Sequence, residues 1–382
     1  MGKTLNHLTV IASFTLISTF LIWLPHILAL PNFWGLSFTE GFNTIYRNFD
    51  GLEYIIIAKS FYEPGLIAGI PQNLPANYFA SHFPGYAAAI FLLAPILGYL
   101  NSMLAVSILF TTASATIFYF LVKDFKLTNQ PLFLTLVFLI LPARWVITRS
   151  VGSSEPMFIF FIIACVYFLM RYTIYHIPYT IYLSALFGLL AQVTRPPGIL
   201  LGIAIGVYAI WLGYQKKSIK TLLSFYPFIL IPLTLLSVFY LFGQQYNDFW
   251  AYFHSGDNIH FTFPPFQVFN KSQFWVGDIW LEDIVYIFIL GFLGVTTLWR
   301  KKLYSLAFLV LTYLTASTLI AHRDISRYIL PITPFIIIAF EKVLVSREFK
   351  IILPIIALAI YLYSQNYILQ NVTPVADLTP YN

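Results

Sequence analysis

The sequence predicts an all-α, polytopic membrane protein with about 10–12 transmembrane helices in a single domain, residues 1–382. Hydrophobic residues make up 59% of the chain and charged residues only 9%, whereas a soluble domain carries about 25% charged residues. The mean hydropathy is +0.79, and apolar stretches follow one another along the whole chain. Within a bilayer such stretches are helical, because a helix satisfies its own backbone hydrogen bonds.

Apolar segments of spanning length, or nearly so, can be traced in order along the chain. They cover residues 8–30, 84–99, 104–122, 130–142, 156–175, 179–194, 197–214, 221–243, 284–299, 303–320, 328–345 and 350–366. The first is long for a signal-peptide core and has no clear cleavage site, so we expect it to be retained as a span. Prolines break several of the others, which predicts that some are tilted, re-entrant or half-spanning.

The basic residues predict the orientation, because cytoplasmic loops are enriched in Lys and Arg. Basic clusters lie in alternate loops, at Lys216–Lys220, Arg300–Lys302 and Arg347–Lys350. These loops are expected in the cytoplasm, which makes 31–83 the first outer loop and 244–283 a second large one. Between these two loops, the segments do not give a consistent alternation of inside and outside loops. We therefore expect either segment 84–99 or segment 130–142 not to cross fully.

The first outer loop contains a tight group of ionisable residues in the run YRNFDGLEY, residues 46–54. If a helix begins at Asp50, then Asp50, Glu53 and Tyr54 fall within one sector of about 100°. We expect this amphipathic helix to lie along the membrane surface with its acidic face toward a cavity. Desolvation would raise the pKa of such a carboxyl group and suit it to act as a base on a hydroxyl. Asp50 and Glu53 are therefore the predicted catalytic residues; the alternative is an ordinary interfacial helix with Asp50 near its N-terminus.

The next segment begins with SHFPGY, which places His82 and Tyr86 four residues apart at the mouth of the predicted cavity. An interfacial aromatic belt would also explain these residues. His82 could bind a metal together with Asp50 and Glu53, although the spacing matches no strong ligand pattern. We therefore predict no metal ligand and no certain cofactor, and leave a divalent metal open.

Two further motifs place a charge where a helix begins or ends. Glu155 follows two serines and precedes Pro156, which has the form of a helix start, so capping alone could explain it. Arg195 lies in a Pro/Gly break between two apolar segments, where it could bind a lipid phosphate or simply extend toward the membrane surface.

A last group of charges occurs in AHRDISRYILPITPF, where Arg323 and Arg327 are four residues apart. Guanidinium groups bind phosphate oxygens through paired hydrogen bonds better than lysine does. The alternative is a surface cluster of these two arginines with Asp324. We predict Arg195, Arg323, Arg327 and His82 as phosphate-binding residues, and Arg47, Tyr54, Tyr86 and Glu155 as substrate-binding residues.

Composition excludes several classes of function. The net charge of +6 is spread through loops, which does not predict binding to nucleic acid. Cys165 is the only cysteine, so the chain has no internal disulfide and no cysteine metal site.

The ordered motifs RNFDGLEYIIIAKSFYE, SHFPGY, SSEPMFIFFIIACVYFLMRY and GLLAQVTRPPGILLG resemble the GPI mannosyltransferase (PIG-V-like) branch of the GT-C glycosyltransferases, over about residues 40–210. The run RYILPITPF is similar to a segment of several polyprenyl-sugar transferases. Asp50 matches the acidic residue that the family carries in its first loop. Ser154–Glu155 matches the Ser-Glu motif of the family, and Thr194–Arg195 matches its Thr-Arg motif. The chain departs from that pattern at Phe49, where many members have Trp, and at His82, where they have Phe.

The resemblance implies a membrane transferase with a GT-C-like fold, whose donor is a polyprenyl-phosphate-linked hexose such as mannose and whose acceptor is a glycan or glycolipid. We expect Asp50 to deprotonate the acceptor hydroxyl, with inversion, on the outer side of a plasma membrane, or of the endoplasmic reticulum in a eukaryote. Two alternatives remain open: a flippase for a lipid-linked saccharide, and a non-catalytic subunit of a transferase complex.

Overall fold

The computed structural model describes residues 2–256, 260–272 and 281–382. The described residues are helical throughout, and their only β structure is isolated bridges. Parts of the predicted second outer loop, at 257–259 and 273–280, lie outside the described residues.

Helices occupy all the apolar segments that the sequence predicted. They are α1 (Gly2–Ile27), α5 (Pro84–Leu97), α6 (Tyr99–Asp124), α7 (Pro131–Ile140), α9 (Glu155–Tyr175), α10 (Thr180–Thr194), α11 (Gly198–Gln215), α13 (Leu230–Tyr246), α15 (Leu281–Arg300), α16 (Tyr304–Thr318), α18 (Thr333–Ala339) and α20 (Arg347–Gln370). Shorter helices connect them: α2 (Asn43–Tyr46), α3 (Gly51–Ser60), α4 (Pro64–Ala68), α8 (Ala143–Thr148), α12 (Ile219–Leu223), α14 (Ala251–His254), α17 (Ile325–Tyr328) and α19 (Glu341–Leu344). The prediction of an all-α, multi-pass membrane protein is confirmed.

The sequence predicted about 10–12 spans, and fewer of the described helices are long enough to span a membrane individually. In the described residues, 7 helices are long and apolar enough to cross a membrane individually, and the remaining apolar helices have 10–17 residues. At about 1.5 Å per residue, a helix needs about 20 residues to cross a hydrocarbon layer of about 30 Å. The shorter helices therefore cross only in combination with a neighbour, or do not cross.

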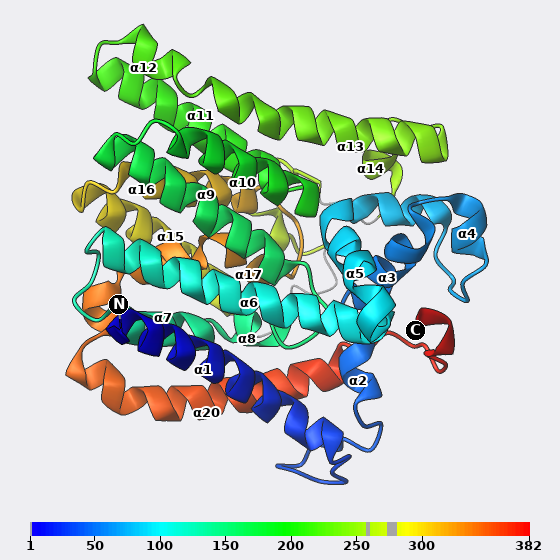
Figure 1. Cartoon of the computed structure of the whole chain (residues 1–382). Coiled ribbons are helices and arrows are strands. Elements are labelled where there is room, and N and C mark those ends of the chain that lie inside the picture. The colour runs from blue at the N-terminus through cyan, green and yellow to red at the C-terminus, as the bar shows by residue number, and fades with distance from the viewer. Residues whose placement is uncertain (1, 257–259, 273–280) are drawn as a thin grey trace.

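The long helices lie side by side in one bundle, with the N-terminus at one end and the C-terminus at the other (Figure 1). Helix α9 is central, because it packs against both α6 and α10. In its most apolar stretch 67% of the residues are buried inside the protein, compared with 17% for α20 at the periphery. The first residue of α9 therefore lies deep in the molecule.

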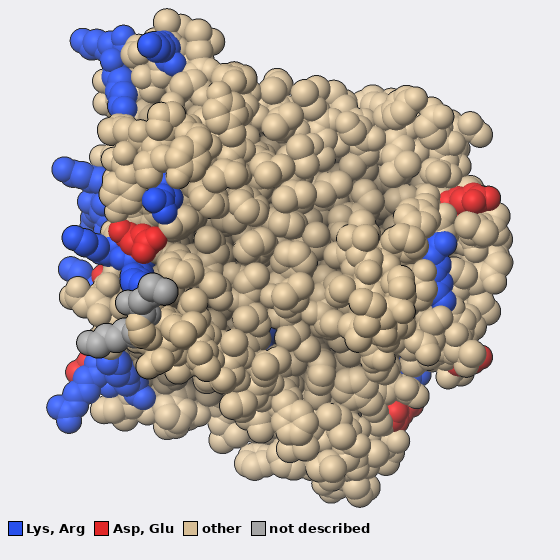
Figure 2. All heavy atoms as spheres, in the orientation of Figure 1, with Lys and Arg blue, Asp and Glu red and all other residues tan. Residues whose placement is uncertain are grey.

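The basic loops share one end of the bundle, as the orientation rule predicted. Lys123 Nζ donates to Thr4 Oγ1 at 2.9 Å, and Lys301 Nζ donates to the carbonyl of Ile338 at 3.0 Å. Lys and Arg gather along the edge where α12 and the N-terminus lie, and charges are sparse across the middle of that face (Figure 2).

The opposite end is formed by the first outer loop, the start of the second and the C-terminal tail. Lys59 Nζ donates to the carbonyl of Asn382 at 2.8 Å, and Asn77 Nδ2 donates to the carbonyl of His254 at 3.3 Å. These contacts join segments that the sequence placed on one side of the membrane.

Both ends of helix α5 bear on the inconsistent alternation of inside and outside loops that the sequence predicted. Its start packs on the end of α10, where a Cβ at Gly85 would lie 2.9 Å from Thr194 Cα. After its end, Tyr46 of the first outer loop donates to Asn101 Oδ1 at 2.7 Å. Both ends of α5 therefore face the half of the molecule that carries the first outer loop, which fits the expectation that segment 84–99 does not cross fully.

Helix α3 differs from the amphipathic surface helix that the sequence predicted. Residues all around it are buried, including Leu52, Ile55 and Ile57, because α5 and the C-terminal tail cover it. The prediction of a helix lying on the membrane surface was wrong, since its apolar residues face protein on several sides.

Candidate functional site

The position of Asp50 depends on a close approach between two glycines. Gly51 begins α3, and a Cβ there would lie 3.1 Å from the carbonyl oxygen of Gly152. Asn48 anchors the preceding turn, because its Nδ2 donates to the carbonyl of Ile368 in α20 at 2.8 Å. The turn 48–51 is thereby fixed against the loop that precedes Glu155.

The carboxylate of Asp50 faces Arg327 and His82 instead of capping its own helix. Arg327 Nη2 donates to Asp50 Oδ2 at 2.5 Å, and His82 Nε2 lies 3.8 Å from the same oxygen. Asp50 occupies the N-cap position of α3, but its side chain makes no capping hydrogen bond. An interfacial helix stabilised by a capping aspartate therefore does not describe this residue.

Glu155, at the start of α9, binds two arginines from separate segments. Its Oε1 accepts from Arg327 Nε at 2.5 Å and also pairs with Arg195 Nη1, while Ser153 Oγ donates to Oε2. The side chain is 2% exposed. A buried carboxylate with these partners does more than cap a helix, which corrects the simpler interpretation.

Arg195 ends α10 and is held in place on two sides. Besides Glu155, its Nη1 donates to Ser154 Oγ at 3.1 Å, and Ser154 also accepts from the hydroxyl of Tyr54 at 3.0 Å. The Arg195 side chain is 14% exposed, so it does not extend toward the membrane surface.

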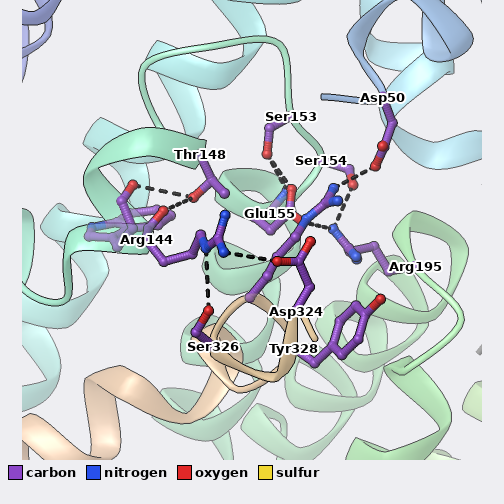
Figure 3. A network of polar contacts seen from close by, with 12 residues as sticks. Asp50, Arg144, Thr148, Ser153, Ser154, Glu155, Arg195, Asp324, Ser326 and Tyr328 are labelled. Carbon is purple, nitrogen blue, oxygen red and sulfur yellow. Dashed lines mark hydrogen bonds and ion pairs between the residues drawn. The ribbon is translucent and has the colours of Figure 1, made fainter. Parts of the chain in front are cut away.

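Together these residues form one chain of charges, Asp50–Arg327–Glu155–Arg195, drawn from α3, α17, α9 and α10 (Figure 3). It borders a cavity of about 630 Å³, a volume suited to a small ligand. The cavity is lined by the predicted residues Asp50, Tyr54, His82, Arg195 and Arg327. The structure therefore brings half of the predicted site residues into one hollow.

The charges in this hollow change the expectation for Asp50. Burial alone would raise the pKa of its carboxyl group, but the adjacent Arg327 guanidinium and His82 hold that pKa well below its usual value. Asp50 is thus ionised at neutral pH, contrary to the raised pKa that the sequence suggested. Burial raises the pKa of the Tyr54 phenol to about 12, so this hydroxyl stays protonated.

Glu53 and Arg323 were predicted in the site but do not line the cavity. Glu53 lies on the side of α3 turned toward the C-terminal tail, close enough to Tyr381 to affect its ionisation. Arg323 is exposed, and Asp324 pairs with Arg144. The alternative prediction, a surface cluster of Arg323, Asp324 and Arg327, is therefore also wrong, because the Arg327 side chain turns inward to Asp50.

Arg47 and Tyr86 lie near the site in the sequence but make structural contacts outside the cavity. Arg47 pairs with Glu40 and donates to the carbonyl of Val375 at 2.9 Å, which ties the first outer loop to the tail. Tyr86 is fully buried, and its hydroxyl accepts the backbone N–H of Ser153 at 3.0 Å. Tyr86 thus shapes the loop before Glu155.

No protein-family model matches this chain, and no curated protein matches it either. The resemblance of its motifs to one branch of glycosyltransferases stays a prediction.

The cavity is also lined by polar residues that the sequence did not assign to the predicted site, namely Tyr78, His260, His322, Asp324 and Tyr328. The sequence placed Asp324 only in the alternative surface cluster, although a charge at the edge of an apolar helix is expensive unless it is paired or functional. Over the described ranges, the His, Cys, Asp and Glu side chains form no group of three that could hold a metal ion.

Proposed function

We propose that this protein is an integral-membrane glycosyltransferase that moves a hexose, with mannose the first to test, from a polyprenyl-phosphate donor to a glycan or glycolipid acceptor. The observation that carries the proposal is the Asp50–Arg327–Glu155–Arg195 chain beside a cavity of about 630 Å³. It offers a carboxylate base and two guanidinium groups within one hollow. The motif order, which resembles the GT-C glycosyltransferases, supports the same activity.

In this mechanism Asp50 removes the proton of the acceptor hydroxyl as that oxygen attacks the anomeric carbon with inversion. The bond from the anomeric carbon to the phosphate oxygen breaks, and the phosphate leaves with the bonding electron pair. Arg195 and Arg327 bind the negative charge that develops on the phosphate, since guanidinium groups form paired hydrogen bonds with phosphate oxygens. A positioned base contributes about 10²–10⁴-fold to such a rate.

The charge balance of the site indicates how donor binding prepares the base. Asp50 and Glu155 already neutralise Arg327 and Arg195, so an incoming phosphate must compete for these guanidinium groups. When the phosphate takes Arg327, Asp50 loses its cation and becomes a stronger base. The donor therefore binds before the acceptor is deprotonated.

The proposed side of the membrane is the one opposite the basic loops. The first outer loop supplies Asp50 and His82, while Lys and Arg side chains gather at the other end of the bundle (Figure 2). Because Lys and Arg mark cytoplasmic loops, the cavity belongs to the non-cytoplasmic half of a cellular membrane.

The experiment that tests the activity uses the purified full-length protein in lipid nanodiscs. It is incubated with a panel of polyprenyl-phosphate hexoses and glycan or glycolipid acceptors, and the products are identified by mass spectrometry. A hexose-extended acceptor is expected with wild-type protein and none with Asp50→Asn. Donor binding without product from any pair would exclude the transferase and favour the flippase or the non-catalytic subunit.

A further inference from the structure

Asp324 is a second carboxylate at the cavity, separate from the chain that holds Asp50. Arg144 Nη2 donates to its Oδ1 at 2.8 Å. Within the part of the chain that the structure describes, no hydrogen bond to Oδ2 occurs. Asp324 lines the cavity, whereas Arg144 does not. One oxygen is thus held from behind while the other remains available to a ligand.

Arg144 is itself firmly placed, which fixes the direction of Asp324. Its Nε donates to Ser326 Oγ at 3.3 Å, and its guanidinium carbon lies 4.0 Å from the centre of the Tyr367 ring. The Arg144 side chain is 8% exposed. In the view of Figure 3, Arg144 reaches Asp324 from the side of α8, while Asp50 lies beyond Glu155.

Two neighbours add other hydrogen-bonding groups to the same wall. The backbone N–H of Asp324 donates to His322 Nδ1 at 3.0 Å, which fixes the imidazole ring beside the carboxylate. The Tyr328 hydroxyl lies 3.1 Å from the same Nδ1. Carboxylate, imidazole and phenol groups on one wall are the kinds of acceptor and donor that a ring with several hydroxyl groups requires.

We propose that Asp324, held by Arg144, binds the ring hydroxyls of the transferred hexose, and that His322 and Tyr328 complete this subsite. The inference rests on the proposed transferase activity and adds a residue that selects the sugar. Asp324 is assigned to binding and not to proton transfer, because Arg144 lies outside the cavity lining and holds one of its two oxygens from behind. A site that hydrogen-bonds a substrate hydroxyl strongly rejects an analogue without it, since its buried polar group is then left unpaired.

The test compares wild type with Asp324→Asn on the parent donor and on donors that each lack one ring hydroxyl. With the parent donor we expect kcat/KM to fall by about 10–100-fold, the range for one hydrogen bond to a charged group. The donor that lacks the contacted hydroxyl should be equally poor with both proteins. Asp248→Asn is the matched control, because Asp248 pairs with His254 and does not line the cavity.

An equal loss with every donor would overturn the inference and make the Arg144–Asp324 pair purely structural. If Asp324→Asn does not fold, His322→Gln is tested instead, because it changes the same wall without breaking the Arg144–Asp324 pair. An equal loss of activity with every donor would then also overturn the inference. The absence of transfer by wild-type protein would instead reject the proposed function. The two failures are therefore distinguishable.

Discussion

Arg327 Nη2 lies 2.5 Å from Asp50 Oδ2, although the two residues are 277 positions apart in the sequence. This contact closes the cavity wall between the first outer loop and α17. It also sets the charge of Asp50, and with it the expected behaviour of the site.

Asp50→Asn is expected to abolish hexose transfer, because the amide cannot accept the proton of the acceptor hydroxyl. The loss should reach at least the ~10²–10⁴-fold contribution of a positioned base. Transfer is measured by product mass spectrometry, and size-exclusion chromatography checks that the variant remains folded. An Asn variant with wild-type activity would remove the base assignment, while Asp248→Asn should retain activity.

Arg327→Lys is expected to raise the KM for the donor, because an ammonium keeps the charge but not the planar fork that binds phosphate. Loss of one hydrogen bond to a charged group should raise this KM by about 10–100-fold. Arg323→Lys is the matched control from the same segment, and its KM should stay near the wild-type value because Arg323 lies outside the cavity lining. Equal effects of the two variants would refute the phosphate role of Arg327.

The pH dependence of stability should report the lowered pKa of Asp50. A carboxyl group whose pKa is lower in the folded than in the unfolded state stabilises the fold above its unfolded pKa, about 3.9, and loses this contribution as pH falls further. The Tm difference between wild type and Asp50→Asn should therefore stay constant from pH 8 to 5 and shrink below about pH 4. A difference that already shrinks between pH 7 and 5 would indicate a raised pKa.

Gly85→Ala should disturb the contact between α5 and α10. The added Cβ would lie 2.9 Å from both Thr194 Cα and the Val193 carbonyl oxygen, and backbone atoms cannot rotate away. We expect a destabilisation of about 1–3 kcal/mol and reduced transfer, because Arg195 directly follows Thr194. Gly206→Ala is the control, since no atom lies within 4 Å of its Cβ position. Similar melting temperatures for both variants would contradict the close packing.

Cysteine labelling should place the first outer loop and the basic loops on opposite sides of the membrane. Glu63→Cys and Lys217→Cys introduce exposed thiols, and the native Cys165 is buried. In sealed right-side-out vesicles, a membrane-impermeant maleimide is expected to label position 63 and not position 217. Labelling of position 217 alone would invert the topology and place the cavity in the cytoplasmic half.

The sequence located the helices well because hydropathy and helical periodicity are local properties. Each predicted apolar segment contains a helix. It failed for α3, where the short pattern around Glu53 resembles an amphipathic surface helix. That helix is buried by α5 and by the tail beyond α20, neither of which a local pattern can reveal.

The sequence by itself determined that the chain is an all-α membrane protein, and it indicated Asp50, His82, Arg195 and Arg327 as residues that meet. The tertiary structure alone decided their partners: Arg327 turns to Asp50 and Glu155, and Asp324 turns to Arg144. The reason is physical, since a charge excluded from water pairs with whichever opposite charge the packing brings within reach, regardless of separation along the chain.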